Sequence, residues 1–192
     1  MTGRTGSGKS TLALSLLGTL HPDPQGGGSI YIGGMDLATV DKESLRRRVT
    51  FVAQDPVLFS GTLRDNLDPL KEHTDDECAG VLARVLGDFK LDSHIHGGGH
   101  NLSQGQRQLV GLARAVLRRS AVVILDEATA SVDFATADYI HEVLRQELRE
   151  STVITIAHRV EAVRDANYYI VLDKGRIVKS GPPGEVEVDD RA

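Results

Sequence analysis

Residues Gly3 to Thr11 constrain the fold of this chain more than any other segment. They fit the pattern G-x-x-x-x-G-K-[ST], with Gly3, Gly8, Lys9 and Ser10 at the fixed positions. Glycines let a loop curl so that successive backbone N–H groups converge on one anion, and a following helix adds its N-terminal dipole. The segment therefore predicts a phosphate-binding loop in which Lys9 faces phosphate and Ser10 is a ligand of Mg²⁺. The apolar positions between Lys9 and Leu20 predict a helix after the loop. The alternative interpretation of the loop is a Gly- and Ser-rich turn before that helix, with no ligand.

Only Met1 and Thr2 precede this loop, whereas a phosphate loop of this kind normally follows a buried strand. We therefore expect the leading strand to be missing from this chain. Its loss would leave inner strands with unpaired N–H and C=O groups and would invite aggregation. We expect residues 1–192 alone to be poorly soluble.

The composition is that of a globular protein with one core. The 192 residues are 40% apolar and 26% charged, and the net charge of −5 does not indicate a nucleic-acid-binding face. Cys78 is the single cysteine and cannot form an internal disulfide, which is compatible with a reducing compartment. The longest apolar runs are too short to cross a bilayer, and the polar N-terminus does not resemble a signal peptide.

Several predicted strands end at a polar residue. In open α/β sheets ligands bind at the carboxyl ends of the strands, so we expect these polar side chains to gather at one edge. The pairs are residues 49–53 with Gln54, residues 121–125 with Asp126 and Glu127, and residues 152–157 with His158. Two adjacent carboxylates at the end of a buried strand cost folding free energy, so we expect them to have a function. Asp126 is therefore a candidate for holding Mg²⁺, and Glu127 is a candidate for deprotonating a water. The alternative for Gln54 is a solvated loop amide. For Asp126 and Glu127 it is a helix-capping acidic pair, and for His158 it is a structural role.

Residues 61–99 are helical and polar in pattern, with few strand signals. Thr74 to Glu77 fits a capping box before an apolar helical face, so we expect a small helical lobe, over about residues 61–105, inserted into the core. Ser103 and Gly105 then precede a second long helix, where they offer either a phosphate contact or an ordinary helix cap. The three nearby histidines allow a metal site, although the glycines between them favour a mobile loop. These histidines are His94, His96 and His100.

Taken together, these segments resemble the nucleotide-binding domain of the ATP-binding cassette (ABC) transporters. Six motifs occur in family order and span nearly the whole chain, and one of them, the signature motif, is specific to this family. The matching segments are the P-loop Gly3 to Ser10, the Q-loop residue Gln54, the signature motif Leu102 to Gln106, the Walker B motif Val122 to Asp126 followed by Glu127, the D-loop Ala130 to Asp133 and the switch residue His158. The resemblance implies an α/β fold: a P-loop NTPase core with a mainly parallel sheet, a short antiparallel β segment and an inserted helical lobe.

The resemblance also implies that the chain binds and hydrolyses ATP with Mg²⁺. The phosphate-contacting residues would be Gly3, Arg4, Thr5, Gly6, Ser7, Gly8, Lys9, Ser10 and Thr11. Ser10, Gln54 and Asp126 would arrange Mg²⁺, and Glu127, His158 and Gln54 would be catalytic. Ser103, Gly105 and Gln106 would contact the ATP of a partner cassette in a head-to-tail dimer.

Residues 54–69 are similar to the C subfamily, the multidrug-resistance-associated transporters. Glu127 and a signature motif with Gln104 in place of Gly resemble the second of the two cassettes of such a transporter. This implies ATP-driven export by a full transporter, with the chain held at the cytosolic face of a membrane by transmembrane domains and with no nucleic acid as partner.

Three departures from the family pattern are expected to matter. The leading strand would carry the aromatic residue that stacks on adenine, the helical lobe is short between Leu86 and Asn101, and the sequence contains no transmembrane helix. We expect this chain alone to hydrolyse ATP weakly or not at all. Two other functions are open: a DNA-tethering ATPase, which the lack of sustained heptads disfavours, and a non-catalytic ATP-binding module, which Glu127 and His158 disfavour.

Overall fold

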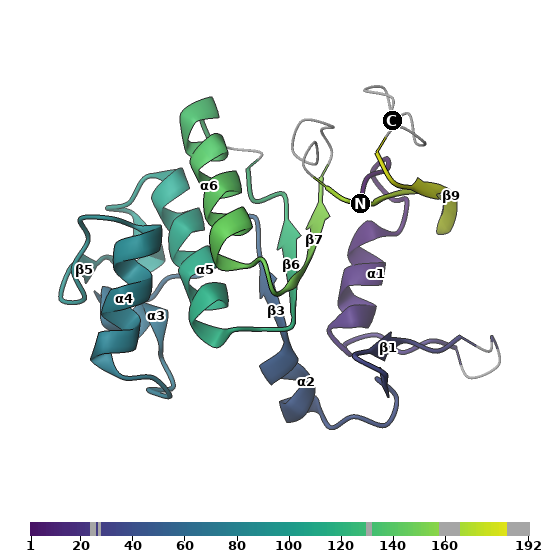
Figure 1. Ribbon diagram of the computed structural model, residues 1–192, viewed down its shortest axis with the longest axis horizontal. Coiled ribbons are helices and arrows are strands. Elements are labelled where there is room, and N and C mark those ends of the chain that lie inside the picture. The colour runs from purple at the N-terminus through teal and green to yellow at the C-terminus, as the bar shows by residue number, and fades with distance from the viewer. Residues whose placement is uncertain (24–25, 27, 130–131, 158–165, 184–192) are drawn as a thin grey trace.

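The computed structural model describes residues 1–23, 26, 28–129, 132–157 and 166–183. Its centre is a parallel sheet in the order β3-β6-β7, formed by Val49–Val52, Val122–Asp126 and Thr152–Ile156. Figure 1 shows α1 on one face of this sheet, and α5 and α6 on the other. The three helices are Lys9–Leu16, Gln104–Arg118 and Phe134–Glu147. The architecture confirms the predicted α/β fold.

Residues 122–125 of the central strand β6 are all apolar because helices cover both faces of the strand. Val123 and Ile124 are fully buried, and they belong to different core clusters. Val123 packs in the cluster that contains the apolar residues of α5 and α6, whereas Ile124 packs in the cluster that contains Ala13 of α1. Side chains of successive strand residues point to opposite faces, so this alternation fixes which helix lies on which side.

Short antiparallel pairs complete the β structure. They are β1 with β2, Tyr31–Ile32 and Met35–Asp36; β4 with β5, Gly61–Thr62 and His94–Ile95; and β8 with β9, Tyr169–Asp173 and Arg176–Gly181. The β8–β9 pair is a hairpin that turns at Lys174 and Gly175. The β4–β5 pair was not predicted, because each of its strands has only two residues and too short a pattern to read.

Residues 63–99, within the expected helical lobe, form small helices packed against α5. They are α3, Leu63–Leu67; α4, Asp75–Val85; and the 3₁₀ turn Gly97–Gly99, and α4 and α5 make many contacts. The predicted capping box is confirmed: Thr74 accepts from the N–H of Glu77, and the Glu77 carboxylate accepts from the N–H of Thr74. The predicted apolar face of α4 is buried, with Cys78 and Val85 fully so.

Helix α1 is shorter than predicted. It ends at Leu16, with Leu17 as the C-cap and Gly18 in the left-handed conformation at φ 65°, where the N–H of Gly18 bonds to the carbonyl of Ser15. Glycine is the usual residue at this position after a helix, because it lacks a Cβ that would clash. Helix α2, Lys42–Arg48, is capped by the side chain of Asp41.

Met1 and Thr2 lie between β7 and β8. Among the described residues, they are the only backbone connection between the β3-β6-β7 sheet and the β8–β9 pair. The N–H of Ala157 bonds to the carbonyl of Met1, and Thr2 forms a parallel bridge to Val171. These two residues therefore pair as a strand would, directly before the loop that starts at Gly3.

Candidate functional site

The predicted phosphate loop joins the Met1–Thr2 bridge to α1 and is shaped by glycines. Gly3, Gly6 and Gly8 have φ values of 147°, 80° and 104°, in the region that favours glycine. A Cβ on Gly3 would lie 2.2 Å from the carbonyl oxygen of Leu172, so the loop is pressed against β8. Gly8 is the N-cap of α1 and has no side chain to bond the first N–H groups. Those donors are therefore available to an anion.

The Lys9 side chain turns back into this loop. Its Nζ donates hydrogen bonds to the carbonyl oxygens of Gly3, at 2.5 Å, and Arg4, at 3.0 Å. Burial lowers the pKa of Lys9, while the charges of Glu127 and Asp126 act in the opposite direction. The two carboxylates are thus close enough to act on the ammonium, which places the loop and the end of β6 in one site.

Asp126 and Glu127 leave the end of β6 in different backbone conformations. Asp126 is the last residue of β6, whereas Glu127 has a left-handed φ of 49° and its N–H bonds to the carbonyl of Ile156 at 3.0 Å. A non-glycine residue with positive φ is uncommon and recurs where a side chain must be aimed. Both residues are partly exposed.

Gln54 lies two residues beyond β3, which neighbours β6, and its side chain is exposed. Its backbone oxygen accepts hydrogen bonds from the side chains of Gln104, at 3.5 Å, and Gln108. The Q-loop is therefore attached to α5. Gln108 was missed in the sequence analysis; its spacing of four residues from Gln104, on one face of a helix, was the available signal.

A second attachment joins the same loop to α5. The guanidinium of the partly buried Arg114 donates to the carbonyl oxygens of Asn66, at 2.7 Å, and Val57, at 2.9 Å. Asn66 is fully buried and bonds to the backbone of Phe59 through both its amide oxygen and its amide nitrogen. Neither residue was predicted, since an Arg and an Asn in helical segments usually face solvent.

The signature residues form a helix N-terminus on the other face of the sheet from α1. Ser103 and Gln106 make a reciprocal capping box, so the predicted ordinary cap is present. Gly105 is buried, and a Cβ there would lie 2.4 Å from Cγ2 of Thr136 in α6. Among the described residues, no hydrogen bond or ion pair joins Ser103, Gly105 or Gln106 to the phosphate loop.

The other predicted site residues lie as follows. Arg4, Thr5, Gly6, Ser10 and Thr11 are exposed, whereas Ser7 is buried and its hydroxyl has no hydrogen-bond partner within the described part of the chain. His158 and Ala130 lie outside the described residues; Asp133, at the end of the predicted D-loop, caps α6. The predicted residues that the structure gathers at one sheet edge are therefore Lys9, Asp126 and Glu127, with Gln54 at the end of the neighbouring strand.

The histidines considered for metal binding lie in the lobe. The rings of His94 and His96 meet edge to face with centroids 5.5 Å apart. Over the described residues, no three or more His, Cys, Asp and Glu side chains gather in a way that could hold a metal ion. In the same residues, no helix is both long and apolar enough to cross a bilayer.

Comparison with known proteins identifies the family. The sequence profile described as ABC transporter matches residues 1–130. The chain belongs to the ABC transporter family. Within it, the chain is 46% identical to ATP-binding cassette sub-family C member 2 of Rattus norvegicus, over 96% of this chain and 12% of that protein. It is 48% identical to the multidrug resistance protein fer6 of Mycosarcoma maydis, over 96% of this chain and 14% of that protein. The sub-family C relative confirms the resemblance to the C subfamily.

A solved structure supports the same assignment. The chain superposes on a bacterial Atm1-family ABC exporter with ATP bound at a TM-score of 0.85 and 32% identity, over 94% of this chain and 32% of that chain. The chain thus spans only 12% to 14% of the length of the curated relatives named above and about a third of the bacterial exporter.

Proposed function

We propose that this chain is an ATP-binding and ATP-hydrolysing cassette of a C-subfamily ABC exporter, and that its hydrolysis is coupled to transport across a membrane. The proposal is supported by the buried Lys9 in a glycine-shaped loop at the open N-terminus of α1, on whose pKa the charges of Asp126 and Glu127 at the end of β6 act. A buried ammonium, an open helix N-terminus and two partly exposed acidic residues are the groups that phosphoryl transfer to water requires.

ATP fits the phosphate loop because glycines leave space there. The N–H groups at the start of α1 and the Lys9 ammonium would hold the β- and γ-phosphates. On binding, Lys9 would exchange its bonds to the Gly3 and Arg4 carbonyls for bonds to phosphate. The Ser7 hydroxyl, buried and without a partner in the described residues, is a further donor that a phosphate oxygen would satisfy.

Mg²⁺ fits the oxygen donors that lie around this loop. Ser10, Gln54 and Asp126 supply a hydroxyl, an amide oxygen and a carboxylate, which are the ligand types that Mg²⁺ prefers. When bound, the ion neutralises charge that develops on the β- and γ-phosphates. Glu127 would accept the proton of the attacking water, and Gln54 and His158 would orient that water and the γ-phosphate.

The signature residues would serve a second ATP. Ser103, Gly105 and Gln106 stand at the N-terminus of α5, across the sheet from α1, so they do not share a phosphate group with Lys9 in the same chain. A head-to-tail partner cassette would bring its own ATP to them. Transmembrane domains complete the proposed transporter. Their contact with this chain would hold it at the cytosolic face of a membrane.

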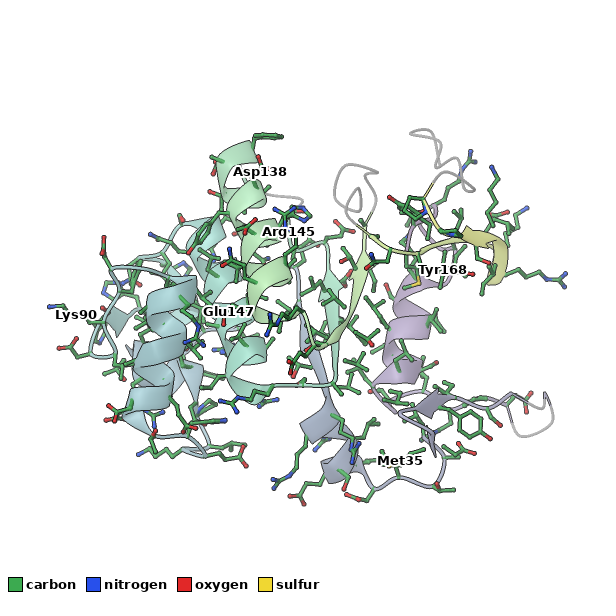
Figure 2. The ribbon with its side chains drawn as sticks, in the orientation of Figure 1. Met35, Lys90, Asp138, Arg145, Glu147 and Tyr168 are labelled. Atoms are coloured by element: carbon green, nitrogen blue, oxygen red, sulfur yellow. The ribbon has the colours of Figure 1, made fainter. Side chains whose placement is uncertain are left out.

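ATP binding tests the proposal most directly. Lys9→Ala should reduce the affinity for a fluorescent ATP analogue by at least about tenfold, because it removes the charge that faces the phosphates. Lys90→Ala is the matched control: Lys90 is exposed on the lobe, at the far side of the molecule from α1 in Figure 2. Equal affinity of the Lys9 variant and the control would remove the phosphate-loop assignment, and with it the proposed function.

A further inference from the structure

Two histidines of the lobe, His94 and His96, lie on one face of the short strand β5 and its end. They are separated by Ile95, which is fully buried. Side chains of successive strand residues point to opposite faces, so the burial of Ile95 turns both histidines outward. Both are exposed, and Figure 1 shows β5 at the outer edge of the lobe, away from α1. The pair is therefore separate from the site at the phosphate loop.

The two imidazole rings lie at a distance that one metal ion would bridge. Their centroids are 5.5 Å apart and their planes meet at 69°. Two imidazole rings bound to one Zn²⁺ ion at a tetrahedral angle, with Zn–N distances of about 2.0–2.1 Å, have centroids about 5 Å apart. Because both rings are exposed, rotation about their side-chain bonds lets one nitrogen of each face a common ion.

The backbone that carries the two histidines is held on both sides. The side chain of Asn101 accepts a hydrogen bond from the N–H of His96, at 2.9 Å, and donates one to the carbonyl of His94, at 2.8 Å. Across the strand, His94 pairs with Thr62 of β4 in the antiparallel ladder. The two histidines are thus positioned before a ligand binds, which reduces the entropy lost on binding.

The glycine turn that follows the pair is bonded to neighbouring backbone. The N–H of Gly99 bonds to the carbonyl of His96 at 2.7 Å, and the N–H of Gly98 bonds to the carbonyl of Leu58 at 3.0 Å. The third histidine, His100, packs against this turn: a Cβ on Gly98 would lie 3.2 Å from its Nε2. Since no three potential metal ligands gather among the described residues, the candidate ligands are the two histidines of the pair.

Imidazole nitrogens favour transition-metal ions over Mg²⁺. Zn²⁺, Cu²⁺ and Ni²⁺ bind well to imidazole, whereas Mg²⁺ takes oxygen ligands. A structural zinc site normally has four protein ligands. A site with two protein ligands differs from it, because water fills the remaining positions and the ion stays open to exchange with solution. Short histidine-rich segments bind metal in this manner.

We propose that His94 and His96 bind one Zn²⁺ ion, with water completing its coordination. Asn101 supports the site by holding the backbone on both sides of Ile95. The site lies on the segment that leads into α5, whose N-cap, Ser103, comes two residues after Asn101. Neither ATP nor the phosphate loop takes part, so the proposal does not depend on the proposed function.

The test measures Zn²⁺ binding by competition with a chromophoric zinc indicator. The purified chain carries no histidine tag, and a fused carrier protein keeps it in solution, with the carrier alone as the blank. We expect saturable binding of one equivalent of Zn²⁺. A large excess of Mg²⁺ should not displace it, because Mg²⁺ binds imidazole poorly. Displacement by Mg²⁺ would place the ion on carboxylates and overturn the proposal, as would the absence of Zn²⁺ binding.

Single substitutions assign the ligands. His94→Ala and His96→Ala should each weaken Zn²⁺ binding at least about tenfold, because the ion loses one of two protein ligands. The matched controls are His100→Ala, in the same loop, and His21→Ala, outside the lobe; both histidines are exposed, and both variants should bind within about twofold of the parent. An equal loss in His100→Ala and His94→Ala would show that the ion is not held by the pair.

Electron paramagnetic resonance with Cu²⁺ separates loss of a ligand from damage to the fold. The parent chain should show coupling of the copper to two imidazole nitrogens, and His94→Ala and His96→Ala should each show coupling to one. Because both side chains are exposed, thermal unfolding without metal should be the same for the parent and the two variants. Coupling to two nitrogens in either variant would overturn the proposal.

Discussion

The side chain of Gln108, buried in α5, donates a hydrogen bond to the backbone oxygen of Gln54, the candidate Mg²⁺ ligand at the end of β3. The two residues are 54 positions apart in the sequence. Their contact connects the helix that starts at the signature motif to the loop that reaches the phosphate site. The position of Gln54 is therefore set by α5 as well as by its own strand.

Gln108→Met should loosen this connection. Methionine is similar in length to glutamine but cannot donate, so the Gln54 carbonyl loses a partner at a cost of about 1–2 kcal/mol in the free energy of unfolding. We also expect a higher Mg²⁺ concentration for half-maximal ATP hydrolysis, since the Gln54 side chain would be less well placed. Urea unfolding and a Mg²⁺ titration measure the two effects. The exposed Gln146→Met serves as control, and an unchanged Mg²⁺ requirement in the Gln108 variant would contradict the inferred role.

The glycine of the signature motif should be intolerant of even one methyl group. In Gly105→Ala the new Cβ would lie 2.4 Å from Cγ2 of Thr136, so α5 and α6 must move apart. We expect a loss of about 1–3 kcal/mol in the free energy of unfolding. The control is Gly80→Ala in α4, whose nearest contact would be an Arg84 side-chain nitrogen at 3.5 Å; it should stabilise the chain by up to about 1 kcal/mol. Thermal or urea unfolding of both variants decides the comparison.

Local patterns in the sequence were sufficient for most elements of the core. The apolar run at β6 predicted a buried strand because burial on both faces leaves a continuous signal. The strands β3 and β7 were also predicted from their apolar residues, although Phe51 of β3 is exposed and most of β7 is only partly buried. The cap at Thr74 was predicted because a capping side chain bonds to a residue only three positions away. Both kinds of signal are contained in a short stretch of sequence.

Features that depend on distant residues were not predicted. The bonds of Gln108 to Gln54 and of Arg114 to Asn66 join segments 48 to 54 residues apart. The spacing of Gln108 from Gln104 shows that the two side chains share a helix face, but no local pattern gives the distant partner of either bond. The strands of the β4–β5 pair are stabilised by each other across 31 intervening residues (63–93), so neither shows a strand pattern alone. The roles of Ser103 and His158 depend on a partner cassette and on residues outside the described part of the chain, and they stay predictions.

The stability of the chain should rise between pH 6 and pH 8. Burial, and to a smaller extent the charge of Lys9, lowers the pKa of the Met1 amino group from 8.0 to about 6. The unfolded chain therefore binds more protons in this range, so stability is lost as the pH falls toward 6. The full difference is at most about 2–3 kcal/mol. Urea midpoints at pH 6 and pH 8 measure it, with N-acetylated chain as control; an equal pH dependence of both forms would show that another group is responsible.

Glu127→Gln should separate binding from hydrolysis. The amide has nearly the same shape as the carboxylate but cannot accept the proton of the attacking water, so we expect ATP affinity within about threefold and turnover lowered at least about a hundredfold. The positive φ of Glu127 and its N–H bond to Ile156 do not involve the side chain, so the fold should persist.

The exposed Glu150→Gln is the matched control for the Glu127 variant. The measurements are binding of a fluorescent ATP analogue and release of phosphate, made with a partner cassette present because the proposed site is completed in trans. With that partner, the Glu127 variant should accumulate as an ATP-bound dimer on size-exclusion chromatography. Phosphate release at the rate of the control would mean that another group is the base, even if Lys9 binds ATP as proposed.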